Sequence, residues 1–313
     1  MSLILAESAK LTTDVLLQGV IETIVKESPI LQLMPFVHIE GNGLTYNREK
    51  ALAAAAWHAP LGDWTTGTAP EFDKLTATLA ILGRNADLDN FIKQTRSNIQ
   101  DIEAVVLELA AKSVRHEFER AVVYGTTGAY LTGQVADANM FNGLIVNIAT
   151  KTGSAQVIGA GATGGALTFA LVDQLIDAVQ GGKPDVLMMS KRSRRKLNDL
   201  TRAAGFAIET QRNEWGTFIQ YWNGIPIVTN DWILDTHVLV ASLETAATTG
   251  ACSTMYALRF GEGAVCGATN GGIQVETVGT LEAKDASRHR IKWYCSLVDF
   301  NVVARAALIG INA

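Results

Sequence analysis

The sequence predicts an α+β fold built around one long helix and one long β-hairpin. Residues 97–124 place apolar side chains at steps of three, four and seven, which is helical spacing, and Gly125 ends the pattern. At 1.5 Å per residue, this helix would be roughly 40 Å long. It follows two strand-like segments, 44–47 and 72–81, that a long loose connection joins. A rod reached through an extended hairpin is unusual in an enzyme and natural in a subunit that lies across its neighbours.

Residues 1–43 are expected to form an N-terminal arm. A short helix is predicted over 13–27, because apolar residues cover one broad face of it and a Ser-Pro pair at 28–29 ends it. The stretch that follows holds a proline and a Gly-Asn-Gly turn, which predict irregular structure. Such a segment needs another surface for its apolar side, either the body of the chain or a neighbour.

The connection inside the hairpin, residues 51–70, is the first candidate interaction site. It carries Trp57 and Trp64 on a segment otherwise rich in Gly, Ala and Thr. A connection of this length without structure of its own is usually functional. Two indole side chains are costly to leave in water, so the tip either folds back on its own domain or docks on another subunit. We expect docking.

Residues 135–250 alternate helical and strand-like segments, which predicts a compact α/β unit. The C-terminal segment 251–313 is strand-like and closes in an apolar run at 301–311. Within the α/β unit, helices are expected at 167–179 and 193–204, and strands at 185–190, 215–221, 224–229 and 238–242.

The only dense basic cluster, residues 191–196, lies at the start of the helix predicted over 193–204. Its cations can form a solvated helix face, pair with acidic groups of a neighbouring subunit, or contact phosphates. We take Arg194 and Arg195 as candidates for an interface between subunits.

Composition limits the class of protein. Hydrophobic residues make up 48% and charged residues 18% of the chain, which supports a substantial core and argues against disorder. The net charge of −5 gives no global signature of nucleic-acid binding. Cys252, Cys266 and Cys295 are widely spaced, which predicts plain buried thiols. No run of about 18 apolar residues occurs, so no membrane span is expected.

One glycine motif suggests a different function. Gly159, Gly161 and Gly164 match the G-x-G-x-x-G of dinucleotide-binding folds, which needs a strand before it and a helix after it. The upstream segment has little strand character, so a flexible surface loop is the preferred interpretation, and a nucleotide-dependent α/β enzyme is the alternative. His116 begins a zinc-protease pattern that Arg120 breaks at the second ligand position. We therefore expect no catalytic residue, cofactor or metal.

The order of parts resembles the major capsid protein of tailed bacteriophages, which has the Hong Kong 97-like fold. The strand and basic helix from 183 to 205, and the turn and strand at 223–228, are similar to local motifs of that family. The resemblance implies an N-terminal arm (1–43), an extended β-hairpin loop (44–84), a spine helix (97–124), an axial α/β domain (135–250) and a peripheral domain (85–134 with 251–313).

The same resemblance implies a function. Copies of the chain would assemble into hexamers and pentamers of an icosahedral phage head around double-stranded DNA, with virion localisation after assembly in the host cytoplasm. The implied partners are other copies of the chain, a separate scaffolding protein and a portal, with weak non-specific contact to the packaged DNA and none to a membrane. The runner-up is an encapsulin, a cellular nanocompartment shell with the same fold.

Overall fold

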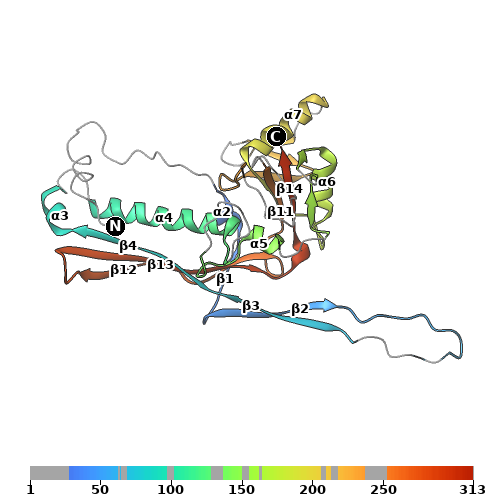
Figure 1. Cartoon of the computed structure of the whole chain (residues 1–313), viewed down its shortest axis with the longest axis horizontal. Coiled ribbons are helices and arrows are strands. Elements are labelled where there is room, and N and C mark those ends of the chain that lie inside the picture. Colours follow the sequence, from blue (N-terminus) through green and yellow to red (C-terminus); the bar gives the residue numbers. More distant parts are fainter. Residues whose placement is uncertain are drawn as a thin grey trace.

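The computed structural model describes residues 28–62, 64, 69–96, 102–127, 137–149, 155–161, 164–205, 209–212, 218–236 and 252–312. In these ranges the chain forms three β-sheets with helices packed on two of them (Figure 1). The predicted arm helix at 13–27, the predicted strand at 238–242 and the first residues of the predicted long helix, 97–101, lie outside the described residues. No helix of the described part is long and apolar enough to cross a membrane.

The long helix is α4, Ile102–Tyr124, and a shorter helix, α3 (Asn90–Arg96), precedes it. It ends at the residue that the sequence predicts, for a steric reason. A Cβ atom on Gly125 would lie 2.4 Å from the carbonyl oxygen of Ala121 and 2.6 Å from that of Phe141. Only glycine lets the chain after α4 approach the helix this closely.

Helix α4 lies along one face of a four-stranded sheet with the order β1-β12-β13-β4 (Figure 1). Side chains of the inner strand β13 alternate between the two faces of the sheet. Ile291 and Trp293 are buried toward α4, whereas Arg290 on the opposite face is exposed. The rings of Trp293 and Phe118 of α4 lie 4.3 Å apart between centroids. The strands are β1 (Phe36–His38), β4 (Ala80–Asp89), β12 (Val265–Thr280) and β13 (Ala286–Asp299), and the four-residue helix α2 (Ile30–Leu33) precedes β1.

A second sheet has eight strands in the order β5-β14-β11-β7-β10-β9-β8, with β6 also paired to β14. Helices α6 (Phe169–Asp177) and α7 (Lys191–Ala203) share one apolar cluster with it, whereas the other face joins the cluster that holds α4 and α5 (Leu144–Ala149). The strands are β5 (Val157–Gly159), β6 (Gly165–Ala166), β7 (Val186–Met189), β8 (Glu209–Arg212), β9 (Phe218–Trp222), β10 (Ile225–Thr229), β11 (Cys252–Leu258) and β14 (Arg305–Asn312).

The expected boundary at residue 250 does not separate the two sheets. Strands β11 and β14 come from the C-terminal segment, yet they lie between β5 and β7 in the eight-stranded sheet, whereas β12 and β13 belong to the four-stranded sheet. The α/β unit of 135–250 is incomplete by itself, because without β11 one edge of the buried strand β7 would be unpaired. The division into arm, extended loop, spine, peripheral and axial domains stays a prediction.

The third sheet is a hairpin of β2 (Gly43–Ala51) and β3 (Glu71–Thr78). The strand expected at 72–81 is in fact two strands. After Leu79 the chain continues as β4, which pairs with β13 in the four-stranded sheet. The predicted boundaries 44–84 include residues 80–84 in the hairpin, but these residues belong to β4 of the four-stranded sheet.

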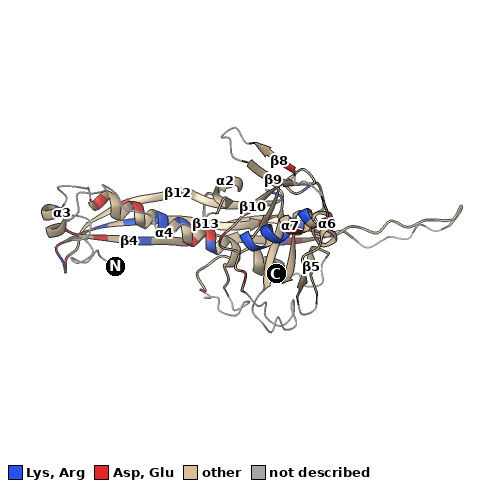
Figure 2. Cartoon of the chain, turned by 90° about the horizontal axis from the view of Figure 1, so that it is seen from above, with Lys and Arg blue, Asp and Glu red and all other residues tan. Residues whose placement is uncertain are grey.

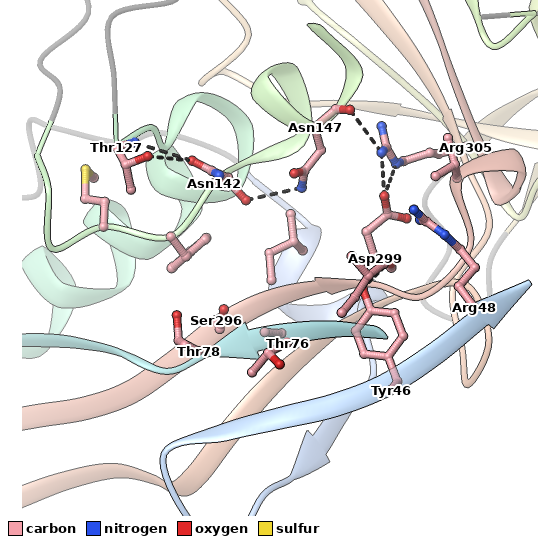
Figure 3. A pocket seen from close by; sticks show the side chains of 16 residues that line it. Tyr46, Arg48, Thr76, Thr78, Thr127, Asn142, Asn147, Ser296, Asp299 and Arg305 are labelled. Carbon is pink, nitrogen blue, oxygen red and sulfur yellow. Dashed lines mark hydrogen bonds and ion pairs between the residues drawn. The ribbon is translucent and has the colours of Figure 1, made fainter. Parts of the chain in front are cut away.

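The three sheets meet at Asp299, the last residue of β13 (Figure 3). Its carboxylate accepts a hydrogen bond from Arg305 Nε of β14 at 2.8 Å, and the second Arg305 nitrogen that reaches it also donates to the carbonyl oxygen of Asn147 in α5 at 3.2 Å. The main-chain carbonyl of Asp299 accepts from the Tyr46 hydroxyl of β2 at 2.8 Å. The Arg305 side chain is 3% exposed and that of Asp299 is 13% exposed, so the ion pair is shielded from water.

The three cysteines are free and buried, as the sequence predicts. Burial raises the pKa of the Cys266 thiol to about 11 and that of the Cys295 thiol to about 12. Cys252 donates to Oδ1 of Asn312 at 3.0 Å. The thiols of Cys266 and Cys295 therefore stay protonated at neutral pH, and all three cysteines are shielded from solvent by burial.

We expect Arg305→Met to lower the free energy of unfolding of the unassembled subunit by about 3–5 kcal/mol, because it leaves the Asp299 carboxylate buried without a cation. The second carboxylate oxygen, Oδ1, has no hydrogen-bond partner among the described residues, so no other donor compensates. Guanidinium unfolding followed by tryptophan fluorescence measures the change. The double variant Arg305→Met/Asp299→Leu is the control and should recover most of the loss. Wild-type stability of the single variant would contradict the assignment.

The raised pKa values of the Cys266 and Cys295 thiols predict slow chemical modification of the native protein. At pH 8 a thiol of pKa about 11 has a thiolate fraction about 100-fold lower than one of pKa 9, so native subunits should react slowly with a thiol reagent such as iodoacetamide. Adding denaturant should release all three cysteines for fast reaction, which mass spectrometry can count. Fast modification of Cys266 or Cys295 in the native protein would show that these strands open.

Candidate subunit interface

The hairpin is fixed to the body at its base. The ring of Tyr46 meets Phe300 edge to face with 4.9 Å between centroids. Apolar hairpin residues, among them Leu44 and Ala77, pack around a small buried cluster that includes Cys266 and Val298. Together with the hydrogen bond from Tyr46 to Asp299, these contacts set the direction in which the hairpin leaves the body (Figure 3).

A polar groove of about 340 Å³ separates the hairpin base from the segment that holds α5. Figure 3 shows hydroxyl and amide side chains on its walls, with Thr76 and Thr78 on the hairpin side and Asn142 and Asn147 on the opposite side. Along this groove the hairpin does not pack directly on α5. There the contacts of Tyr46 with Asp299 and Phe300 attach the hairpin to the body.

Beyond its base the hairpin is held by its own pairing. Strands β2 and β3 pair as far as Ala51 and Glu71, with one bulge after Glu49 that shifts the register. Lys50 forms an ion pair with Glu71 at 2.9 Å, but both side chains are more than half exposed, so this contact contributes little. Figure 1 shows the hairpin projecting from the body as a narrow two-stranded ribbon.

The tip places both predicted tryptophans in solvent. Trp57 is 103% exposed and Trp64 is 84% exposed, and Leu52 and Leu61 of the same loop are also exposed. Trp64 stacks on His58 with 4.4 Å between ring centroids, so the two residues form one flat surface. The described tip residues lie away from the body of the chain (Figure 1).

The tip has the chemistry of a binding surface. Burying an apolar or aromatic side chain contributes about 1.5–3 kcal/mol, so four such side chains are a substantial reserve of binding energy. Aromatic residues on such surfaces frequently dominate affinity. A ribbon only two strands wide cannot bury these side chains itself, since it has no second layer.

Helix α7 carries the basic cluster on another part of the molecule (Figure 2). It begins at Lys191, two residues before the predicted start, because the Ser190 hydroxyl accepts from the backbone N–H of Ser193 at 3.1 Å and caps the helix. Lys191 pairs with Asp231 at 2.9 Å. Arg195 is exposed, and among the described residues it forms no ion pair.

Arg194 lies beside it and is partly buried. Its Nε has no hydrogen-bond partner among the described residues, and its guanidinium forms no ion pair with them. The structure therefore places Trp57 and Trp64 on the same exposed tip and places Arg194 and Arg195 on a separate surface.

The glycine motif does not form the turn that a dinucleotide needs. Gly159 ends β5, and Gly164 has a positive φ of 84° just before β6, so a second strand follows the loop and α6 starts only at Phe169. A Cβ atom on Gly165 would lie 2.2 Å from the carbonyl oxygen of Ala160. Gly164 and Gly165 therefore let the backbone pass close to Ala160 and to Asn312 of β14. The described residues contain no cluster of three or more metal-binding side chains.

Sequence reasoning missed the residues that hold the hairpin. Tyr46, Asp299 and Arg305 are far apart in the chain, and nothing in their local patterns links them. One signal was present: Arg305 stands inside the apolar run 301–311, where a charged residue needs a partner.

A comparison with protein families identifies the chain over most of its length. The family model of the SU10 major capsid protein matches residues 20–290. No curated protein matches significantly in sequence.

Solved structures share the fold across nearly the whole chain. The holo-SrpI encapsulin complex from Synechococcus elongatus PCC 7942 has a TM-score of 0.70 at 16% identity and covers 100% of this chain and 97% of its own. The capsid of the native GTA particle has a TM-score of 0.65 at 15% identity, with 99% and 98% covered. The capsid of Myoviridae phage XM1 has a TM-score of 0.62 at 13% identity, with 99% of both chains covered.

At these identities the structural matches show only the fold, which is the predicted Hong Kong 97-like capsid fold. Membership of the family is shown by the match to the family model. The chain belongs to the SU10 major capsid protein family, and it is a capsid subunit.

Proposed function

We propose that copies of this chain assemble into the hexamers and pentamers of an icosahedral phage head that encloses double-stranded DNA. The observation that carries the proposal is the projecting hairpin tip with its exposed Trp57 and Trp64. Side chains of this kind need a partner outside their own chain, and the partner that a capsid subunit always has is another copy of itself.

The proposed mechanism is mechanical. The hairpin acts as an arm that lies over an adjacent subunit, with the two indoles as anchors in its apolar contact. Each subunit both gives and receives such a contact, so it is held at several sites at once. Several modest contacts then act together, because once one has formed the next is intramolecular.

Arg194 and Arg195 are proposed to form a second contact between subunits. Their guanidinium groups have no ionic partner among the described residues, and the chain as a whole has an acidic excess of five charges. Two parallel N–H donors on each guanidinium suit a carboxylate of the neighbouring copy. Such a contact orients subunits without needing a large apolar area.

The remaining partners follow from the proposed role. A separate scaffolding protein and a portal would act during assembly in the host cytoplasm, and the finished shell would be part of the virion. The net charge of −5 fits a shell that confines DNA through weak non-specific contacts and does not grip it. The role is structural, with no reaction assigned to the chain.

An encapsulin shell is the second candidate, and one observation favours it. The holo-SrpI encapsulin complex superposes on the complete chain with a TM-score of 0.70. The two candidates share a fold and differ in what the shell encloses. Protein cargo inside purified particles, in place of DNA or scaffold, would decide for the encapsulin.

We expect electron microscopy of the purified recombinant chain to show closed shells or hexameric capsomers. The reason is that the apolar tip and the unpaired cations are present in every copy. A chain that stays monomeric or dimeric at high concentration would contradict the proposed function.

The double variant Trp57→Ala/Trp64→Ala should fold normally and lose assembly. Both side chains are exposed and lie outside the core, so removing them leaves the core unchanged, whereas the loss of two anchors of about 2 kcal/mol each should raise the critical assembly concentration at least about tenfold. Sedimentation velocity against concentration measures it. Phe218→Ala, which removes an exposed aromatic ring of β9, is the matched control and should assemble like the wild type.

A further inference from the structure

The turn between β9 and β10 consists of an asparagine followed by a glycine. Strand β9 ends at Trp222, β10 begins at Ile225, and these two residues pair across the hairpin. Asn223 and Gly224 connect them with φ values of 49° and 71°, the pattern that a type I′ turn requires. Both residues are exposed, so movement of this turn displaces no side chain of the core.

An Asn-Gly pair is chemically reactive. The backbone nitrogen of the glycine can attack the side-chain amide carbon of the asparagine, because the attack closes a five-membered ring and glycine has no Cβ atom to hinder it. The chain contains four such pairs, which begin at Asn42, Asn142, Asn223 and Asn270. The surroundings of each pair therefore decide which one reacts.

A lysine distinguishes the pair at 223. Nζ of Lys183 donates a hydrogen bond to the main-chain carbonyl oxygen of Asn223. This oxygen belongs to the peptide group whose nitrogen, that of Gly224, is the nucleophile. When the nitrogen loses its proton, the negative charge is shared with the oxygen, so the ammonium group stabilises the reactive anion where its charge develops. In the described part of the chain the N–H of Gly224 donates to no backbone acceptor, so its proton is available.

Asp173 of α6 holds the second reactant. Its Oδ1 accepts a hydrogen bond from Nδ2 of Asn223 at 3.3 Å and another from Nε1 of Trp222 at 3.0 Å. The contact engages the side-chain nitrogen, which is the leaving group of the reaction. The amide carbonyl group of Asn223 has no hydrogen bond to the described residues, so it is free to turn toward the nitrogen of Gly224.

The pair at 142 has the same chemistry and the opposite surroundings. The N–H of Gly143 donates to the carbonyl oxygen of Gly125 at 2.9 Å, so this nitrogen is not available. Oδ1 of Asn142 accepts from the N–H of Thr127 at 3.3 Å. A Cβ atom on Gly143 would lie 2.4 Å from the carbonyl oxygen of Ala121, so the backbone is tightly packed there. This pair is an internal control.

We propose that Asn223 is a site of spontaneous deamidation, which Lys183 promotes. The nitrogen of Gly224 loses its proton to water or hydroxide and forms a bond to Cγ of Asn223. The bond from Cγ to Nδ2 breaks, and Nδ2 takes a proton from water and leaves as ammonia. Water then opens the succinimide ring and leaves an aspartate or an isoaspartate in place of Asn223. The inference does not depend on the proposed function, because all of these contacts lie within one chain.

The product changes the charge of this surface. It replaces the Nδ2 donor with a second carboxylate beside Asp173, and neighbouring like charges repel each other. The hydrogen bond from Trp222 to Asp173 helps to hold β9 on α6, together with the stacking of Trp222 on Phe169 at 5.2 Å between ring centroids. Deamidation therefore loosens this edge of the eight-stranded sheet, and isoaspartate also lengthens the main chain of the turn by one methylene group.

Peptide mapping by mass spectrometry tests the site in the native chain, after incubation in mildly alkaline buffer. Asn223 should deamidate before the other three Asn-Gly pairs, and Asn142 should stay intact. In the denatured chain Asn142 and Asn223 should react at similar rates, because each is followed by glycine and neither has a fold around it. Native deamidation that begins at another pair would overturn the proposal. The same ratio of rates in the native and the denatured chain would also overturn it, since the fold would then not select the site.

Two variants of Lys183 test its promoting role. Lys183→Met removes the cation and should slow the reaction at Asn223 about tenfold, which corresponds to about 1.4 kcal/mol. Lys183→Arg keeps a cation and should retain most of the wild-type rate. A lysine that only braced the turn would give the opposite result, because its removal would free the turn and speed the reaction. An unchanged or faster rate in Lys183→Met therefore overturns the assignment. Lys183 is exposed, so both variants should fold.

Discussion

The ion pair between Asp299 and Arg305 is the constraint on which the arrangement of this subunit depends. Asp299 ends the four-stranded sheet, and Arg305 opens the last strand of the eight-stranded sheet. The pair is shielded from water, so its geometry is strict, because neither charge can turn to solvent instead. Through Asn147 and Tyr46 the same few atoms also hold α5 and the hairpin, so the body is one unit in which the hairpin has a defined direction.

This arrangement separates the parts that stabilise the subunit from the parts that bind other subunits. The apolar residues around α4 and between the strands of the eight-stranded sheet are buried within the chain. The apolar residues of the tip contribute nothing to that core, since they are exposed away from the body of the chain. A subunit of this kind can fold before it assembles, and it keeps an unmatched surface for other copies.

The fold also explains why a motif of nucleotide enzymes occurs in a shell subunit. Beside β14, glycine is required at two positions: Gly164 has a positive φ of 84°, and a Cβ atom on Gly165 would lie 2.2 Å from the carbonyl oxygen of Ala160. Glycines at such spacing serve close approach of backbone to backbone as well as of backbone to phosphate. What distinguishes the two uses is the element that follows, which here is the strand β6.

Local sequence patterns account for the long helix and its end at Gly125, for a hairpin that carries Trp57 and Trp64, and for the helices on the eight-stranded sheet. These follow from periodicity, glycine and capping, which act between residues close in the chain. Long-range packing, in contrast, sets that β11 and β14 complete the sheet of β7, that β4 leaves the hairpin, and that Asp299 contacts both Arg305 and Tyr46. Those outcomes depend on strand pairing and on the burial of charge between residues up to about 250 positions apart in sequence, and a local pattern carries no information about which distant edge or charge will be the partner.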